Sequence, residues 1–362
     1  APLLADLPMV RKLELNGAVR QTHYSRSSPG LSSSSLSVTT WKVGAVYEPF
    51  DMLRLRVTRS RDIRAPNISE LFGPVTSGRT TVVDPANGGT QVQVTSYTGA
   101  NPLLQPEKAD TFTVGAVLQP RIPFGRSLNL SVDYFDISIN GAISTLGAQT
   151  VVNRCNSGAS EYCPYVSRDG SGNLLQVQDL LQNVNGQKVR GIDINFAYST
   201  HKGPWGSLDF NVMATRYLEF STRDSAGVTD RVCQTGFRPG TTTGVPCWIV
   251  DGNLGWNIGK VRANLHGRYI PPGKFDVLLV GPEDPGYSPS LSNSVNTNRV
   301  AGRFYLDMGL NVKVNDQFEV FGVVNNLFDT DPSMAASAQG GTNQVYFDPI
   351  GRNFKFGARV RM

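Results

Sequence analysis

The sequence contains no run of about 18 apolar residues, the minimum for a membrane-spanning helix, although hydrophobic residues make up 40% of its 362 positions. A transmembrane helix is therefore excluded. Heptads and long amphipathic periods are also scarce, whereas 37 glycines and 22 prolines favour many turns. Strands remain as the main elements, because alternation of apolar and polar side chains conceals their hydrophobicity.

Metal-binding patterns are equally scarce, since the chain has only three histidines and no CxxC motif. The four cysteines form two close pairs, Cys155 with Cys163 and Cys233 with Cys247. Zinc is the competing interpretation, but no histidine lies near either pair. The spacing favours two local disulfides over zinc and indicates an oxidising compartment. We expect no metal and no cofactor.

The net charge of +5 raises the question of nucleic acid. The basic residues are scattered singly, as in "LRLRV", and do not form patches interleaved with stacking aromatics. Nucleic acid is therefore not an expected partner.

Alternation with a period of two predicts about twelve strands, by the template for a half-buried strand. The clearest spans 303–314, with Phe304, Leu306 and Met308 on one face and Arg303 and Asp307 on the other. The other predicted strands span 12–20, 40–48, 52–58, 110–119, 127–139, 191–199, 207–220, 252–258, 261–269, 318–326 and 352–362.

The connections between these strands alternate in length. Short turns alternate with long loops near 60–106, 141–187, 221–249, 271–302 and 326–350, and with one medium loop (24–38) at the same end as the long ones. This parity places every long loop at one end of the sheet. Many of the strands are also as long as a tilted membrane-spanning strand requires. Together these features favour an all-β fold, an antiparallel transmembrane β-barrel with short periplasmic turns and long extracellular loops, over a soluble sandwich.

Four motifs carry a family resemblance. They are "RSRDIRAPNISELFGP" (59–74), "NPLLQPEKADTFTVG" (101–115), "VNNLFDTDP" (324–332) and "YFDPIGRNFKFGARVRM" (346–362). In this order they resemble motifs in the barrels of TonB-dependent outer-membrane receptors. That family's barrel has 22 strands and a plug, so the resemblance implies that residues 1–362 are the C-terminal part of such a barrel, without the plug or the TonB box. Within the first motif, Asn67 followed by Glu70 predicts a capped helical turn.

The resemblance also implies a function and partners. The function is uptake of a scarce nutrient (siderophore-iron, cobalamin or an oligosaccharide) across the bacterial outer membrane, with no enzyme activity. The implied partners are outer-membrane lipid, an extracellular small-molecule or glycan ligand, the TonB complex acting through the missing plug, and the outer-membrane insertion machinery. In the long loops we predict ligand contacts at Arg79, Tyr97, Arg168 and Tyr287.

A complete twelve-stranded barrel is the alternative, either an autotransporter translocator or an outer-membrane phospholipase. The phospholipase needs a serine activated by a histidine. His23 is predicted to start the medium loop, His201 to lie in a turn and His266 to lie on a polar strand face without a nearby serine. No catalytic residue is therefore assigned.

The last strand shows how the faces are expected to divide. Phe354, Phe356, Ala358 and Val360 are predicted to face lipid, and Lys355, Arg359 and Arg361 a polar lumen. The segment also resembles the C-terminal signal of outer-membrane proteins, although Met362 stands where an aromatic residue is usual.

Overall fold

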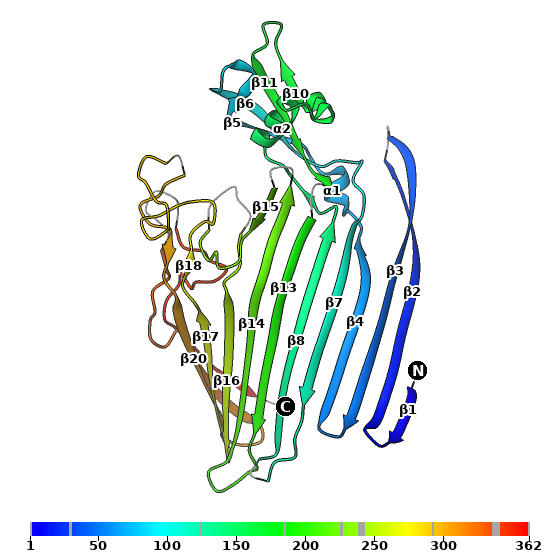
Figure 1. Ribbon diagram of the computed structural model, residues 1–362. Coiled ribbons are helices and arrows are strands. Elements are labelled where there is room, and N and C mark those ends of the chain that lie inside the picture. The colour runs from blue at the N-terminus through cyan, green and yellow to red at the C-terminus, as the bar shows by residue number, and fades with distance from the viewer. Residues whose placement is uncertain are drawn as a thin grey trace.

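The computed structural model describes residues 2–28, 31–123, 125–183, 186–224, 227–237, 243–291, 293–334 and 341–360. One large antiparallel sheet dominates it, and consecutive strands are neighbours along its path (Figure 1). The path runs through β1 (Pro2–Leu7), β2 (Val10–Ser28), β3 (Leu31–Phe50), β4 (Leu53–Arg64), β7 (Glu107–Leu118), β8 (Ser127–Asn140), β13 (Gly186–Ser199), β14 (Ser207–Asp224), β16 (Trp248–Ile258), β17 (Val261–Ile270), β20 (Arg303–Lys313), β21 (Phe318–Asn325) and β22 (Asn353–Val360).

The twelve predicted strands correspond to β2 through β22 on this path, so the all-β prediction is confirmed. The sheet also contains β1, which was not predicted because Leu3 and Leu4 break the alternation. The prediction of a medium loop over 24–38 is wrong, since β2 runs to Ser28 and β3 begins at Leu31. Strand pairing uses backbone groups, so the serines of this hairpin pair without apolar alternation.

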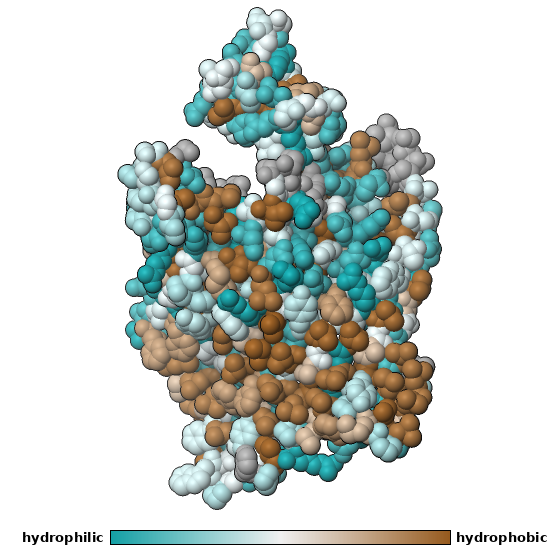
Figure 2. Space-filling view, in the orientation of Figure 1, coloured by the Kyte–Doolittle hydropathy of each residue, from teal (hydrophilic) through white to brown (hydrophobic). Residues whose placement is uncertain are grey.

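The two faces of the sheet differ in chemistry. One face carries apolar rows that continue from strand to strand, as the register shows for Leu55, Ala116, Val132, Ile194, Ala214 and Val250. Figure 2 shows a band of such side chains over the lower part of the sheet, with hydrophilic side chains nearer the long connections. We call these the apolar face and the polar face. Phe354 and Phe356, 59% and 78% exposed, lie on the apolar face, whereas Lys355 lies on the polar face. Arg361 and Met362 lie outside the described residues.

All connections at one end of the sheet are short, and those at the other end are long except the β2–β3 hairpin (Figure 1). The long ones span 65–106, 141–185, 225–247, 271–302 and 326–352. They contain α1 (Ile68–Phe72), β5 (Thr76–Asp84), η1 (Pro85–Asn87), β6 (Thr90–Gly99), β9 (Ile143–Ser144), α2 (Ala148–Asn156), η2 (Ser160–Tyr165), β10 (Val166–Arg168), β11 (Leu174–Leu180), β12 (Gln182–Asn183), β15 (Gly227–Asp230), β18 (Gly273–Lys274) and β19 (Arg299–Val300).

Two of the long connections build a second sheet together, which we call the loop sheet. Its strand order is β10-β11-β6-β5, and β11 pairs with β6 in parallel although about 80 residues separate them. A small core joins α2 to this sheet and consists of Val82, Val94, Val151, Val152, Leu174 and Val177. The loop sheet therefore projects beyond the end of the large sheet as a unit with its own core (Figure 1).

A second core lies among the later connections, and we call it the loop cluster. It consists of Ile270, Phe275, Leu279, Val300, Tyr305 and Phe347. Within the described ranges, β1 and β22 form the two edges of the large sheet and are not paired with each other. None of the helices described is long and apolar enough to span a membrane.

Candidate functional site

Hydrogen-bonded polar side chains line the polar face. Arg56 on β4 donates two hydrogen bonds to Asp133 on β8, at 2.7 and 2.6 Å, and so reaches across β7. The Thr215 hydroxyl donates to Asp193 at 2.7 Å. Farther along the face, His266 lies between two carboxylates. The polar face can therefore line an aqueous passage, because its charges are already paired across neighbouring strands.

Gly115 makes the Arg56–Asp133 bridge possible. It lies on β7 directly between these two residues in the register. A Cβ atom at this position would overlap Oδ1 of Asp133 and would lie 2.9 Å from the Val132 carbonyl oxygen. The lack of a side chain thus leaves the gap through which the guanidinium reaches the carboxylate.

Gly115→Ala is expected to lower the free energy of unfolding by about 1–3 kcal/mol, the usual cost of overpacking. The half-exposed ion pair itself contributes little, so the cost arises mainly from displacing Asp133 and the Val132 backbone. Urea titration of the full-length protein in detergent, followed by gel mobility without heating, measures this loss of stability. Gly309→Ala is the matched control, because a Cβ atom there meets open space on the same face. Equal midpoints for the two variants would contradict the prediction.

The first two sequence motifs, 59–74 and 101–115, meet where the large sheet joins the loop sheet. Arg64, at the end of β4, donates two hydrogen bonds of 2.7 Å to Glu107 at the start of β7 and two of 3.0 Å to Glu70 in α1. Glu70 also closes the predicted capping box with Asn67, with both bonds at 2.8 Å, so the capped turn is confirmed. Arg64 thus links both motifs, and we call this group the Arg64 junction.

The Arg64 junction extends into the second long connection. Glu107 accepts a hydrogen bond from the Ile143 amide at 2.7 Å, and Asn101 donates to the Leu181 carbonyl at 2.8 Å. Both motifs were recognised in the sequence, but the pairing of Arg64 with Glu107 was not predicted. Their opposite charges at facing strand ends were the available signal.

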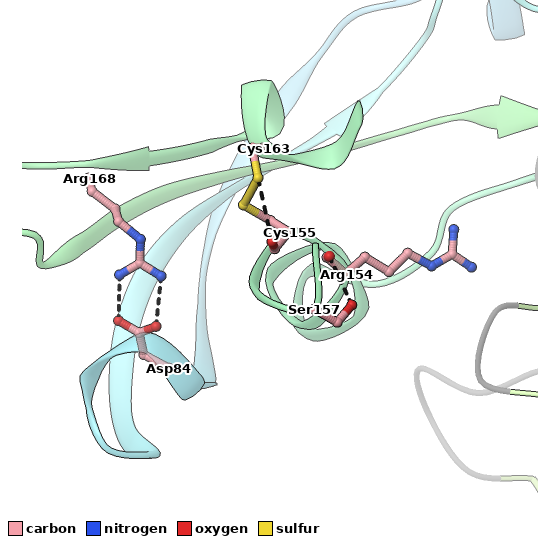
Figure 3. Close-up of a disulfide and its surroundings, with 6 residues drawn as sticks. All are labelled: Asp84, Arg154, Cys155, Ser157, Cys163 and Arg168. Atoms are coloured by element: carbon pink, nitrogen blue, oxygen red, sulfur yellow. Dashed lines mark hydrogen bonds and ion pairs between the residues drawn. A yellow bond between two sulfur atoms is a disulfide. The ribbon is translucent and has the colours of Figure 1, made fainter. Parts of the chain in front are cut away.

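Arg168, a predicted ligand contact, takes part in an ion pair inside the loop sheet. It donates two hydrogen bonds of 2.7 Å to Asp84, whose side chain has no exposed surface (Figure 3). These hydrogen bonds hold the pKa of Asp84 below its ordinary value. The same view shows the Cys155–Cys163 disulfide, which joins α2 to η2. The other disulfide pairs Cys233 with Cys247, so both pairs are those that the spacing predicts.

The other predicted ligand contacts are divided between two places. Arg79 on β5 is exposed and donates to Gln93 at 3.3 Å. Tyr97 on β6 is half-buried and lies between Ser77 and Gln178 in the register. Arg79, Tyr97 and Arg168 therefore all belong to the loop sheet, but Arg168 bonds Asp84 on the face that carries the core, whereas Arg79 and Tyr97 lie on the other face. Tyr287 belongs to the connection between β18 and β19 and is not part of that sheet.

Sequence reasoning did not anticipate the polar groups that hold the loop cluster. Lys274 donates to Asp284 at 2.7 Å, and Asn298 donates to the same carboxylate at 2.9 Å. Burial by itself would raise the pKa of Asp284, but hydrogen bonds from the Gly281 amide, Lys274 and Asn298 outweigh it and lower the pKa to about 2. These partners are separated in the sequence, so no local pattern marks them.

One histidine, His23, lies in a different element from the one that the sequence predicted. His23 lies within β2 rather than at the start of a loop, and its Nδ1 lies 3.0 Å from the Ser37 hydroxyl. His266 lies 3.4 Å from Asp251 and 3.2 Å from Asp307. Across the parts of the chain that the structure describes, no group of three or more His, Cys, Asp or Glu side chains is placed to hold a metal ion.

Comparison with known families gives one match over most of the chain. The family described as "TonB dependent receptor-like, beta-barrel" matches residues 4–327. No curated protein sequence matches the chain.

Several solved structures are similar to this chain over most of its length. The siderophore receptor PirA from Acinetobacter baumannii is 16% identical with a TM-score of 0.57, over 89% of this chain and 40% of its own. A mutant ferric enterobactin receptor, PfeA from Pseudomonas aeruginosa in complex with enterobactin, is 14% identical with a TM-score of 0.57, over 96% and 51%. The FrpB iron transporter from Neisseria meningitidis (F3-3 variant) is 14% identical with a TM-score of 0.58, over 96% and 43%. At these identities the likeness shows the fold, and the chain spans about half or less of each structure.

Proposed function

Because the chain belongs to the TonB-dependent receptor β-barrel family, whose members are integral outer-membrane proteins, we propose that it forms the C-terminal wall and outer loops of a receptor for active nutrient uptake. The observation that carries the proposal is the Arg64 junction, which fixes the loop sheet to the end of a sheet with one apolar and one polar face. In this proposal the apolar face contacts lipid and the polar face lines the passage. The energy for uptake comes from the TonB complex, acting on a plug elsewhere in the receptor.

The proposed ligand is a scarce nutrient captured at the long connections. Siderophore-iron, cobalamin and oligosaccharides are the candidate classes, and ferric siderophores are the first to test because the solved structures named above are siderophore or iron receptors. Arg79 and Tyr97 are the proposed contacts on the loop sheet, since the first offers an exposed cation and the second a half-buried phenol. Tyr287 is the proposed contact from the connection between β18 and β19.

Uptake by cells that carry the full-length receptor tests the proposal. We expect accumulation of one labelled nutrient class among ferric siderophores, cobalamin and oligosaccharides, and we expect loss of TonB to abolish it. A receptor-deletion strain supplies the background rate. Accumulation that persists without TonB would contradict energised uptake, and no accumulation of any class would contradict the receptor function.

A further inference from the structure

The apolar face changes character toward the long connections. The row containing Val57, Val114 and Ile192 also contains Tyr134 and Trp248. Arg216 belongs to the same row, and its guanidinium carbon lies 5.3 Å from the centre of the Trp248 ring. Amphipathic aromatic rings are typical of the boundary between the hydrocarbon and the headgroups. This row therefore marks the upper limit of the lipid-facing band.

Basic side chains occupy the rows beyond that boundary on the same face. Successive rows are about 6–7 Å apart along the strands. The next row holds Arg59 and Arg190, and the one after it holds Arg61 and Lys188. Lys108 and Arg223 lie in the following row. We call these residues, together with Arg216, the outer basic patch. It extends from β4 to β14, which is about 19 Å across.

Three acidic residues on these rows leave an excess of positive charge. Asp110 accepts two hydrogen bonds of 2.9 Å from Arg61. Glu219 lies 2.7 Å from Nε of Arg190 and 3.6 Å from Nζ of Lys188, and Asp136 lies 3.9 Å from the same Nζ. In these rows, from β4 to β14, seven basic against three acidic side chains leave an excess of four positive charges. The excess is three when Asp230, the partner of Ser221 on β15, is included. Arg59 and Lys108 are exposed and form no ion pair with any described residue.

We propose that the outer basic patch binds the phosphorylated headgroup of a lipid in the outer leaflet. The apolar band would contact the acyl chains, and the patch continues directly from it, at the height where headgroup phosphates lie. Arginine and lysine bind phosphate through charge-assisted hydrogen bonds, and their apolar stems can lie along the band while the charged groups reach the headgroup. The acidic residues hold Arg61 and Arg190 in place across the strands. A bound lipid would therefore meet an ordered surface.

Binding of a defined lipid to the purified full-length receptor in neutral detergent tests the proposal. The probes are diphosphoryl lipid A, its dephosphorylated form and inorganic phosphate. The test variant combines Arg59→Gln, Lys108→Gln and Lys188→Gln. The matched control removes the same charges from the polar face with Lys42→Gln, Lys355→Gln and Arg359→Gln. Unheated gel mobility checks that both variants are folded.

We expect the test variant to bind diphosphoryl lipid A at least about tenfold more weakly, because each basic residue near an anionic lipid surface contributes about a fivefold factor. The control variant should bind as the unmodified receptor does, and removal of the phosphates from the lipid should abolish the difference. Equal binding by the test variant, or equal loss in the control, would overturn the proposal. So would binding of inorganic phosphate as tight as that of the lipid.

The inference rests on the proposed function only for the orientation of the sheet in the membrane, which places the long connections outside the cell. The lipid assay contains neither nutrient nor TonB. Its failure would leave uptake intact, and a failure of uptake would leave the lipid measurement unchanged.

Discussion

Replacement of Arg168 by glutamine is expected to destabilise the loop sheet by about 3 kcal/mol or more, the usual cost of removing one partner from a buried ion pair. Asp84 has no exposed surface, so the variant would leave a carboxylate without its cation or force it to take up a proton. Because the pKa of Asp84 is depressed, this contribution is present above the carboxylate's unfolded pKa and is lost as the pH falls through its folded value. Hydrogen exchange at the amides of β5, β6, β10 and β11, in the full-length receptor, measures the change.

Arg79→Gln is the matched control, since Arg79 lies in the same sheet but is exposed and makes one long hydrogen bond to Gln93. We expect its effect on protection to stay within about 0.5 kcal/mol, as for most surface substitutions. Comparison of the two variants also distinguishes a structural role of Arg168 from a role in ligand binding. Weaker nutrient binding with unchanged protection would identify it as a ligand contact and would contradict a structural role.

Removal of the second disulfide, by Cys233→Ser with Cys247→Ser, is expected to destabilise the loop cluster by about 3 kcal/mol. This is the chain-entropy estimate for a closed loop of this length, in which 14 positions separate the two cysteines. The Lys274 amide donates to the Cys233 carbonyl at 2.7 Å, so the effect should reach β18. Loss of amide protection at residues 273–279, compared with the unmodified receptor, measures it.

The other disulfide provides the control. Cys155→Ser with Cys163→Ser opens a shorter loop, of 8 positions, and acts on the loop sheet. Its loss of protection should appear in α2 and leave residues 273–279 unchanged. Equal losses in both regions for both variants would show that the disulfides act on the whole molecule instead.

Alternation predicted twelve strands of the large sheet because each of them has one apolar and one polar face. Phe354 and Phe356 illustrate this, since their neighbours Asn353 and Lys355 lie on the opposite face. The same signal disappears where both faces are polar. The upper parts of β2 and β3 were therefore predicted as a loop, although Tyr24 pairs with Leu36 and Ser25 with Ser35.

The candidate site was less accessible to sequence reasoning. The capping box of Asn67 and Glu70 was predictable, because its two residues are three positions apart. Arg168 was predicted as a ligand contact because it is a polar residue in a long connection. Its partner, Asp84, lies in another connection 84 positions away. A sequence shows neither the contact between these two residues nor the burial of the carboxylate, so a residue of an internal ion pair was predicted to be an exposed cation.

The parallel pairing of β6 with β11 has a consequence for how the chain folds. Gln176 pairs with Thr95, and β7 and β8 lie between them in the sequence. Contacts this distant along the chain form slowly, because closing a long loop costs chain entropy before the contact can stabilise it. Until residues 166–180 arrive, one edge of β6 is unpaired and Val94 lacks part of its cover. Unpaired strand edges promote aggregation. We therefore expect the biogenesis of this region to be limited by the delivery of its second connection, which makes that interval the one in which chaperone protection matters most.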